Sequence, residues 1–222
     1  MWRDAVLIAG RDLRIEARSR VVVNQVAPFA VLVLVLFAFA LDPDRGVLER
    51  AAAGLFWVAV LFSALLAVQR SFSLESADGT RDALRLSGLD PAGIFLGKAL
   101  AVAAQLAALQ VLLGTGIVVL YGTDLGRPAL LVATAALATA GLAAAGTVYG
   151  ILAAGLRVRE TLLPLLLLPV VAPVLLAATR AWEAGLASVA SEGWPWLRVL
   201  GVFAVVYTAV GIAAFGSLLE DA

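Results

Sequence analysis

Long runs of apolar residues, separated by short polar segments, dominate this chain. Six runs reach the roughly 20 residues that an α-helix needs to cross the hydrocarbon core of a bilayer. They cover residues 22–41, 47–68, 92–121, 128–155, 161–179 and 197–219. The third and fourth exceed that length, so we expect tilt or extension beyond the membrane. No internal repeat or long linker divides the chain. The pattern therefore predicts an all-α membrane protein, with six transmembrane helices in one bundle and a single domain over residues 1–222.

Residues 1–20 carry a different pattern, an apolar stripe at steps of three or four residues. The stripe consists of Trp2, Val6, Ala9, Leu13 and Ala17. Arginines project from roughly the opposite side and also exclude a cleavable signal peptide. This spacing predicts an N-terminal amphipathic helix that lies along the cytoplasmic headgroups, with its cations toward anionic lipid. The alternative is a plain polar tail.

Composition and charge agree with a membrane location. Of the 222 residues, 63% are apolar and 14% are charged, against about 45–50% and 25% in soluble domains. With the N-terminus in the cytoplasm, the inside segments hold 11 Lys and Arg residues and the outside segments hold five. Positive residues favour the cytoplasmic side. We therefore predict a multi-pass protein of the bacterial inner membrane with both termini in the cytoplasm.

The chemistry available to this chain is narrow. It has no cysteine and no histidine, and its single methionine is Met1. This excludes disulfides, thiolate or imidazole metal sites and a Ser/His protease, so we expect no enzyme, no metal and no bound cofactor. No acidic residue or arginine lies near the centre of a span, and Lys98 and Arg198 lie near span ends, where their stems can reach the interface. Because ion-coupled carriers usually need a titrating group in the transport path, the driving force must come from outside the chain.

Small residues and prolines shape two of the spans. Gly146 and Gly150 form a GxxxG pair in the fourth span, which is typical of close helix approach. In the fifth span, Pro164, Pro169 and Pro173 each remove a backbone donor. They predict a bent or locally open helix, serving either as a hinge or as a kink for packing.

The loop at residues 69–91 is the most informative cytoplasmic segment. Gly79 allows a sharp turn, Thr80 is a good N-cap, and Gly88 can end a helix in the left-handed conformation. Asp90 then caps a new helix with Pro91 at its first position. The residues assigned to partner binding are Glu75, Asp78, Gly79, Thr80, Arg81, Leu84 and Leu86. They predict a short amphipathic coupling helix that docks a cytoplasmic partner, with a connector lying on lipid as the alternative.

Two further segments bear on the partner. The second cytoplasmic loop offers Arg157, Arg159 and Glu160. The stretch from Gly93 to Ala99 resembles a phosphate-binding loop, but it is one residue short, lacks the hydroxyl that binds magnesium and opens an apolar helix. We therefore expect ATP to be bound by another subunit.

Several motifs, in order and spacing, resemble one family. Glu75-x-x-Asp78-Gly79-Thr80, followed by Gly97-Lys98, resembles the cytoplasmic loop of ABC-2-type permeases. The other matching stretches are Arg11–Arg18, Trp57-Val58-Ala59, Gly146-Thr147, Arg157–Pro164, Leu168-Pro169 and Pro173. Together, over nearly the whole chain, they resemble the haem exporter permease family of cytochrome c maturation (CcmB).

That resemblance implies a set of partners and a task. It implies a permease paired with a separate ATP-binding subunit (CcmA-like), a haem-handling membrane protein (CcmC-like) and a small accessory subunit (CcmD-like). Haem is the implied substrate, delivered to a periplasmic haem chaperone. A homodimer is a further candidate assembly, and no nucleic acid is expected.

The residues leave two mechanisms open. Tyr121, Tyr149 and Tyr207 are the only familiar axial haem ligands besides Met1, and packing or interfacial roles suit them better. This favours a mechanical coupler, in which ATP-driven closure of the partner pushes residues 75–89 to release a loaded chaperone. The competing hypothesis is an apolar cleft that passes haem. Other classes also stay open: an ABC-2-type permease that exports a lipid-linked glycan or a drug, and a structural assembly protein.

Overall fold

The computed structural model describes residues 1–20, 22–41, 45–77, 88–154, 159–187 and 190–221. Within these ranges the chain forms seven α-helices, one π-helical segment and no strand. The elements are α1 (Trp2–Ser19), η1 (Val22–Val26), α2 (Ala27–Leu41), α3 (Arg45–Ala77), α5 (Pro91–Tyr121), α6 (Pro128–Ala154), α7 (Arg159–Leu186) and α8 (Ala190–Asp221). The all-α architecture predicted from the hydrophobic pattern is confirmed.

Six of the helices, α2, α3 and α5 to α8, are long and apolar enough to cross a membrane, and they match the six predicted spans. Helix α3 continues to Ala77 and α7 to Leu186, past the predicted ends at 68 and 179. Residues 69–77 were predicted to belong to the loop, and this boundary was wrong. The physical reason is that hydropathy marks only the part of a helix that lipid surrounds, whereas backbone hydrogen bonds continue into the polar region.

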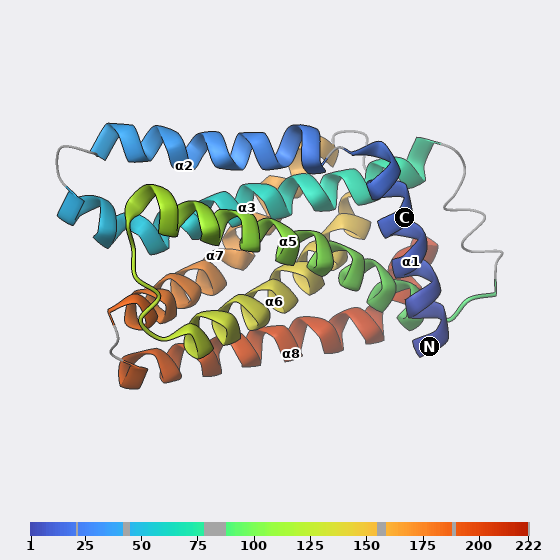
Figure 1. Cartoon of the computed structure of the whole chain (residues 1–222). Coiled ribbons are helices and arrows are strands. Elements are labelled where there is room, and N and C mark those ends of the chain that lie inside the picture. Colours follow the sequence, from blue (N-terminus) through green and yellow to red (C-terminus); the bar gives the residue numbers. More distant parts are fainter. Residues whose placement is uncertain (21, 42–44, 78–87, 155–158, 188–189, 222) are drawn as a thin grey trace.

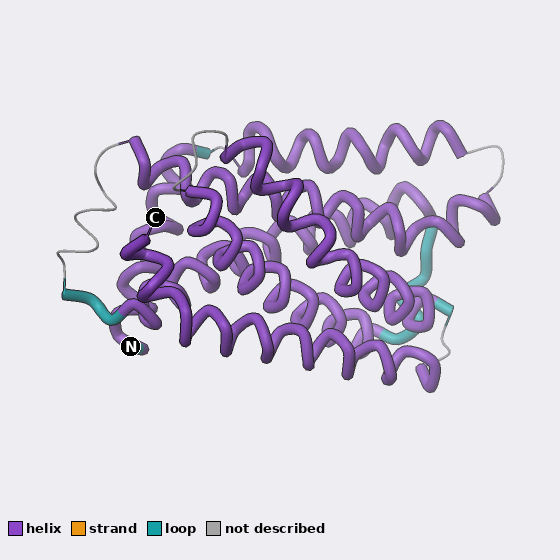
Figure 2. Tube along the Cα trace, turned by 180° about the vertical axis from the view of Figure 1, so that it is seen from behind, coloured by secondary structure: helices purple, strands orange, loops and turns teal. Residues whose placement is uncertain are grey.

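The six spans run side by side along one direction, and α1 crosses one end of the bundle (Figures 1 and 2). Both marked chain ends lie at that end, as do the last turn of α3 and the start of α5. Helix α6 packs against α7 and α8, and α3 packs against α5, α6 and α7. Helix α2 lies at the edge, with 17% of its apolar window buried against 67% for α3.

Small residues and aromatic rings fill the interior. A Cβ added at Gly146 would lie 2.6 Å from Val68 Cγ2, and one at Gly150 would lie 2.3 Å from Phe72 Cε2. The predicted GxxxG pair therefore brings α6 directly onto α3. Further along α3, the rings of Phe56 and Trp182 stack with centroids 3.9 Å apart, which joins α3 to α7.

The three prolines of the fifth span all lie inside α7, which continues through them. Pro164 is half-buried, whereas Pro169 and Pro173 are exposed on the outer surface of the bundle. Their hinge role stays a prediction.

Candidate functional site at the end of the bundle crossed by α1

Helix α1 packs onto the first turns of α5 through two glycines. A Cβ added at Gly93 would lie 2.8 Å from both Asp4 Cβ and the Met1 carbonyl oxygen. One added at Gly97 would lie 2.6 Å from Ile8 Cβ and 2.7 Å from the Ala5 carbonyl oxygen. The segment dismissed above as a phosphate loop is thus a GxxxG pair whose missing side chains let two backbones meet.

The side of α1 that faces the bundle is not the predicted apolar stripe. Ala5, Ile8 and Glu16 are buried, while Trp2 and Val6 of the stripe are each 66% exposed. Residues 2–19 are helical, and of the stripe Trp2, Val6 and Ala17 are exposed, whereas Ala9 and Leu13 are half-buried. An interfacial position on lipid stays a prediction.

A buried lysine lies beneath α1. Lys98 is 1% exposed, and its Nζ atom lies 3.5 Å from Asp12 Oδ2 and 4.8 Å from the centre of the Phe72 ring. The prediction that its stem reaches the membrane interface was wrong. Because α1 covers this part of α5 and supplies a carboxylate, the ammonium group ends inside the protein instead of in water.

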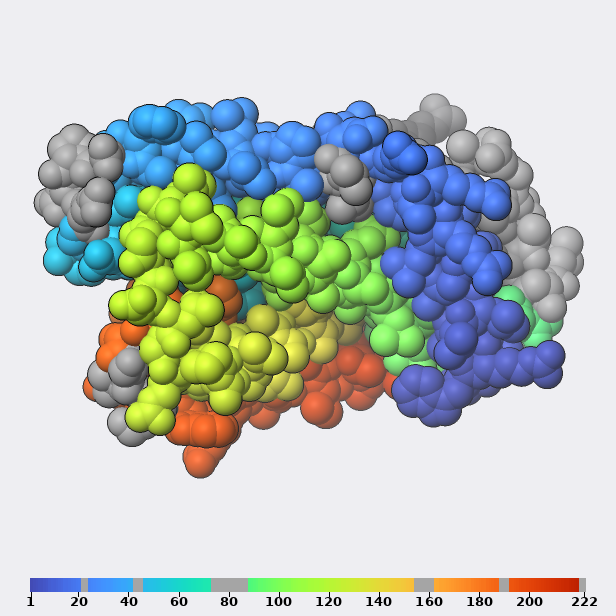
Figure 3. Space-filling view, viewed as in Figure 1, coloured from blue at the N-terminus to red at the C-terminus, as the bar shows by residue number. Residues whose placement is uncertain are grey.

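A second ion pair joins α1 to α3. Glu16 Oε2 lies 3.9 Å from Arg70 Nε, near the end of α3. At the other end of α1, Asp4 Oδ2 accepts a hydrogen bond of 3.4 Å from the Asp90 backbone N–H. Helix α1 therefore contacts both helices that flank the segment 78–87, and Figure 3 shows it lying against the first part of α5.

The Met1 amino group contacts the side chains of both Asp4 and Asp90. It lies 3.2 Å from Asp4 Oδ2 and 3.4 Å from Asp90 Oδ2. The hydrogen bond to Asp4, followed by the one to Asp90, raises the pKa of this amino group above its ordinary value. The three groups therefore fix the first turn of α1 against the start of α5.

Only part of the predicted coupling segment can be located. Gly88 has the predicted positive φ of 69°. Asp90 Oδ1 accepts a hydrogen bond of 3.1 Å from Ala92 N–H, with Pro91 at the first helical position, so this cap is confirmed. Glu75 lies in α3, and Arg159 and Glu160 lie in α7, without described side chains. The other predicted partner-binding residues, which lie outside the described residues, are Asp78, Gly79, Thr80, Arg81, Leu84, Leu86 and Arg157.

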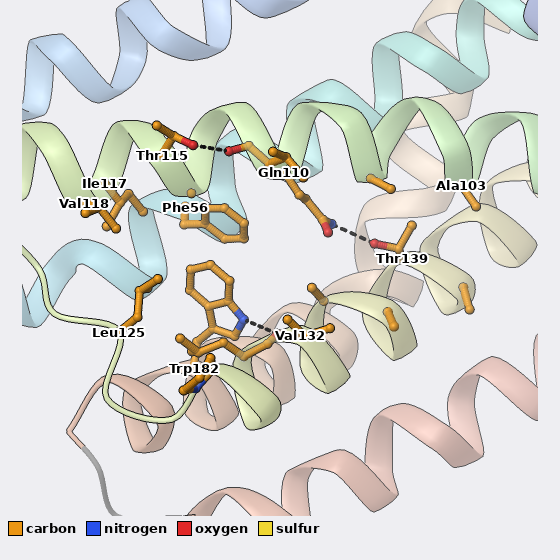
Figure 4. A pocket seen from close by; sticks show the side chains of 18 of the residues that line it. Phe56, Ala103, Gln110, Thr115, Ile117, Val118, Leu125, Val132, Thr139 and Trp182 are labelled. Atoms are coloured by element: carbon orange, nitrogen blue, oxygen red, sulfur yellow. Dashed lines mark hydrogen bonds between the residues drawn. The ribbon is translucent and has the colours of Figure 1, made fainter.

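An apolar groove of about 850 Å³, which was not predicted from the sequence, lies between α5 and α6 (Figure 4). Seven of its 21 lining residues are alanine or glycine, most of the others are larger apolar residues, and Phe56 and Trp182 lie at one side. Gln110 Nε2 donates to Thr139 Oγ1 at 2.7 Å across the groove wall. The available signal was the run of small residues at helical spacing on facing sides of two spans, namely Ala103, Ala104, Ala107, Gly114, Ala135, Ala136 and Ala140.

The three tyrosines lie at contacts between helices. Tyr121 O–H donates to the Leu34 carbonyl oxygen at 3.1 Å and joins α5 to α2. The rings of Tyr149 and Tyr207 lie 6.4 Å apart, between α6 and α8. This confirms the packing role predicted for Tyr121 and places the other two at a helix contact.

The chain is similar to proteins of one family along nearly its whole length. The family model described as CcmB protein matches residues 3–221. The chain is 32% identical to Heme exporter protein B of Pseudomonas aeruginosa over 213 residues, covering 94% of each chain. It is 33% identical to the protein of that name from Haemophilus influenzae, covering 93% of this chain and 94% of the relative. The Paracoccus denitrificans protein of the same name is 31% identical, with 93% of each chain covered.

Proposed function

This chain belongs to the CcmB protein family, and we propose that it is the membrane-spanning permease subunit of an ABC-type exporter that acts in haem export for cytochrome c biogenesis. The observation that carries the proposal is the match along nearly the whole chain to relatives named heme exporters. Six helices able to cross a membrane support a multi-pass protein of the bacterial inner membrane.

ATP hydrolysis enters through a separate CcmA-like subunit that docks on residues 75–89. Three observations support this part of the proposal. The sequence lacks a GxxxxGK[ST] motif. Helices α3 and α5 flank the segment, so a force on it acts on two spans at once. Helix α1 holds both spans through the Glu16–Arg70 and Asp12–Lys98 pairs, which makes this end of the bundle one mechanical unit.

We favour mechanical coupling over passage of haem through this subunit. The chain has no histidine or cysteine, and Met1 is its only methionine, so it lacks the usual axial ligands of haem iron. In this scheme, motion of the ATPase tilts the spans and releases a haem-loaded chaperone. A CcmC-like protein holds the haem, a CcmD-like subunit assists, and a second copy of this chain completes a dimer.

Co-purification from native membranes tests the docking role. The wild-type chain should recover an ATP-binding subunit, and replacement of Glu75, Asp78 and Gly79 by alanine should abolish that recovery. Asp124→Ala is the matched control, because Asp124 is exposed in the loop between α5 and α6 at the other end of the bundle. If the triple variant retained both the ATPase and cytochrome c maturation, the docking assignment would be wrong.

A further inference from the structure

The α5–α6 groove is long, narrow and apolar. Its lining on α5 runs from Leu100 to Val118 and on α6 from Pro128 to Ala140. At 1.5 Å per residue these stretches are roughly 27 Å and 18 Å long. Both belong to helices long and apolar enough to span the membrane, so the groove lies at the depth of the hydrocarbon core.

The width of the groove decides what can occupy it. A volume of about 850 Å³ over such a length gives a cross-section of roughly 30–50 Å². Extended hydrocarbon chains fit a space of this cross-section. The space is real, since a Cβ added at Gly114 would meet nothing within 4 Å.

The chemistry of the lining also selects hydrocarbon. Three polar side chains line the groove, and each already has a partner. Gln110 donates to Thr139, and Thr115 Oγ1 donates to the Val111 carbonyl oxygen at 2.9 Å. A ligand with polar groups along its length would lose their hydration without compensation. At the end nearest the α5–α6 loop, Leu125 and Pro128 line the groove, and the exposed Arg127 lies between them in sequence.

We propose that the α5–α6 groove binds the acyl chains of a phospholipid taken laterally from the bilayer, with its phosphate near Arg127. The membrane supplies this ligand at high local concentration. Phe56 and Trp182 close one side of the groove with a rigid aromatic wall, and the alanines leave the room for the chains. The site does not depend on the proposed function, because neither haem nor the ATPase is needed for lipid to fill the groove.

Photo-crosslinking tests the site in the full chain. We would reconstitute the protein in vesicles of phosphatidylethanolamine and phosphatidylglycerol that contain phosphatidylethanolamine with a diazirine in its acyl chain, and map adducts by mass spectrometry. Ala107→Phe together with Ala136→Phe fills the groove. Ala108→Phe is the matched control, because Ala108 is an exposed neighbour outside the lining.

We expect adducts on residues 103–118 to fall at least fivefold in the filled variant and to persist in the control. Adducts around Val202–Val206, on the exposed side of α8, should not change. If the filled variant does not fold, native mass spectrometry of the wild-type chain should still show retained phospholipid after detergent exchange. Labelling of the groove no stronger than that of α8, absence of retained lipid, or displacement of the adducts by added haem would each overturn the proposal.

Discussion

The ammonium group of Lys98 and the carboxylate of Asp12 lie 3.5 Å apart, although 86 residues separate them in sequence. Lys98 belongs to a helix that crosses the membrane and Asp12 to one that lies across its end. The contact is reinforced by Phe72, whose ring lies beneath the ammonium group. One buried cation thus joins α1, α3 and α5 at the end where we place the ATPase.

Asp12→Asn should destabilise the protein more than Lys98→Met. The first change removes the counter-charge of an almost fully buried ammonium group, and we expect the free energy of unfolding to fall by about 3 kcal/mol. The second change keeps an apolar side chain in place of the lysine stem and leaves Asp12 paired with Arg11, whose Nη2 lies 2.8 Å from Asp12 Oδ1. We therefore expect Lys98→Met to lower the free energy of unfolding by about 1 kcal/mol. Unfolding in mixed detergent micelles measures both. Equal losses would show that the buried charge is not what stabilises this contact.

Gly97→Ala should detach α1 from the bundle. The added methyl group would lie 2.6 Å from Ile8 Cβ and 2.7 Å from a backbone oxygen, so α1 must move. Limited proteolysis within residues 1–20 should become faster. Gly10→Ala is the control, because a Cβ there meets nothing within 4 Å and alanine favours helix by about 1 kcal/mol. Protection equal to wild type in Gly97→Ala would contradict the proposed packing.

Gly150→Ala should weaken the contact between α6 and α3. Its methyl group would lie within 2.3–2.4 Å of two Phe72 ring atoms, and we expect a cost of about 1–3 kcal/mol. Gly201→Ala in α8 has open space around its added Cβ and should be neutral or slightly stabilising. Thermal unfolding monitored by circular dichroism compares the two. A Gly201→Ala loss as large as that of Gly150→Ala would remove the steric explanation.

The orientation of the bundle can be tested with single cysteines, since the chain has none of its own. A cysteine at Arg3, which is exposed on α1, should react with a membrane-impermeant maleimide only in inverted vesicles. One at Asp124, on the opposite end of the bundle, should react in intact spheroplasts. The positive-inside distribution predicts this result. The reverse pattern would move the coupling segment to the wrong side for an ATPase.

Pro169→Ala tests the hinge. Alanine restores a backbone N–H to α7 at an exposed position, so the melting temperature should rise. If α7 must flex during transport, cytochrome c maturation should fall despite the higher stability. Unchanged maturation would assign Pro169 to packing.

Much of the fold can be predicted from residues that are close together in the sequence. The six spans follow from hydrophobic length, because lipid requires every backbone polar group in a span to be satisfied within a helix. The cap at Asp90 and the positive φ of Gly88 follow from the geometry of a few neighbouring residues. The helical state of residues 2–19 follows from its periodicity. Each of these depends only on residues close together in sequence.

What the sequence could not decide depends on which helices meet. Near the start of α5, Gly93 and Gly97 suggest a defective phosphate loop until α1 is found against them. Lys98, close to the end of a span, suggests a side chain that reaches water until Asp12 and Phe72 are found around it. The groove exists because small residues of α5 and α6 face each other. Burial and cavities are properties of pairs of distant segments, so only the tertiary structure determined them.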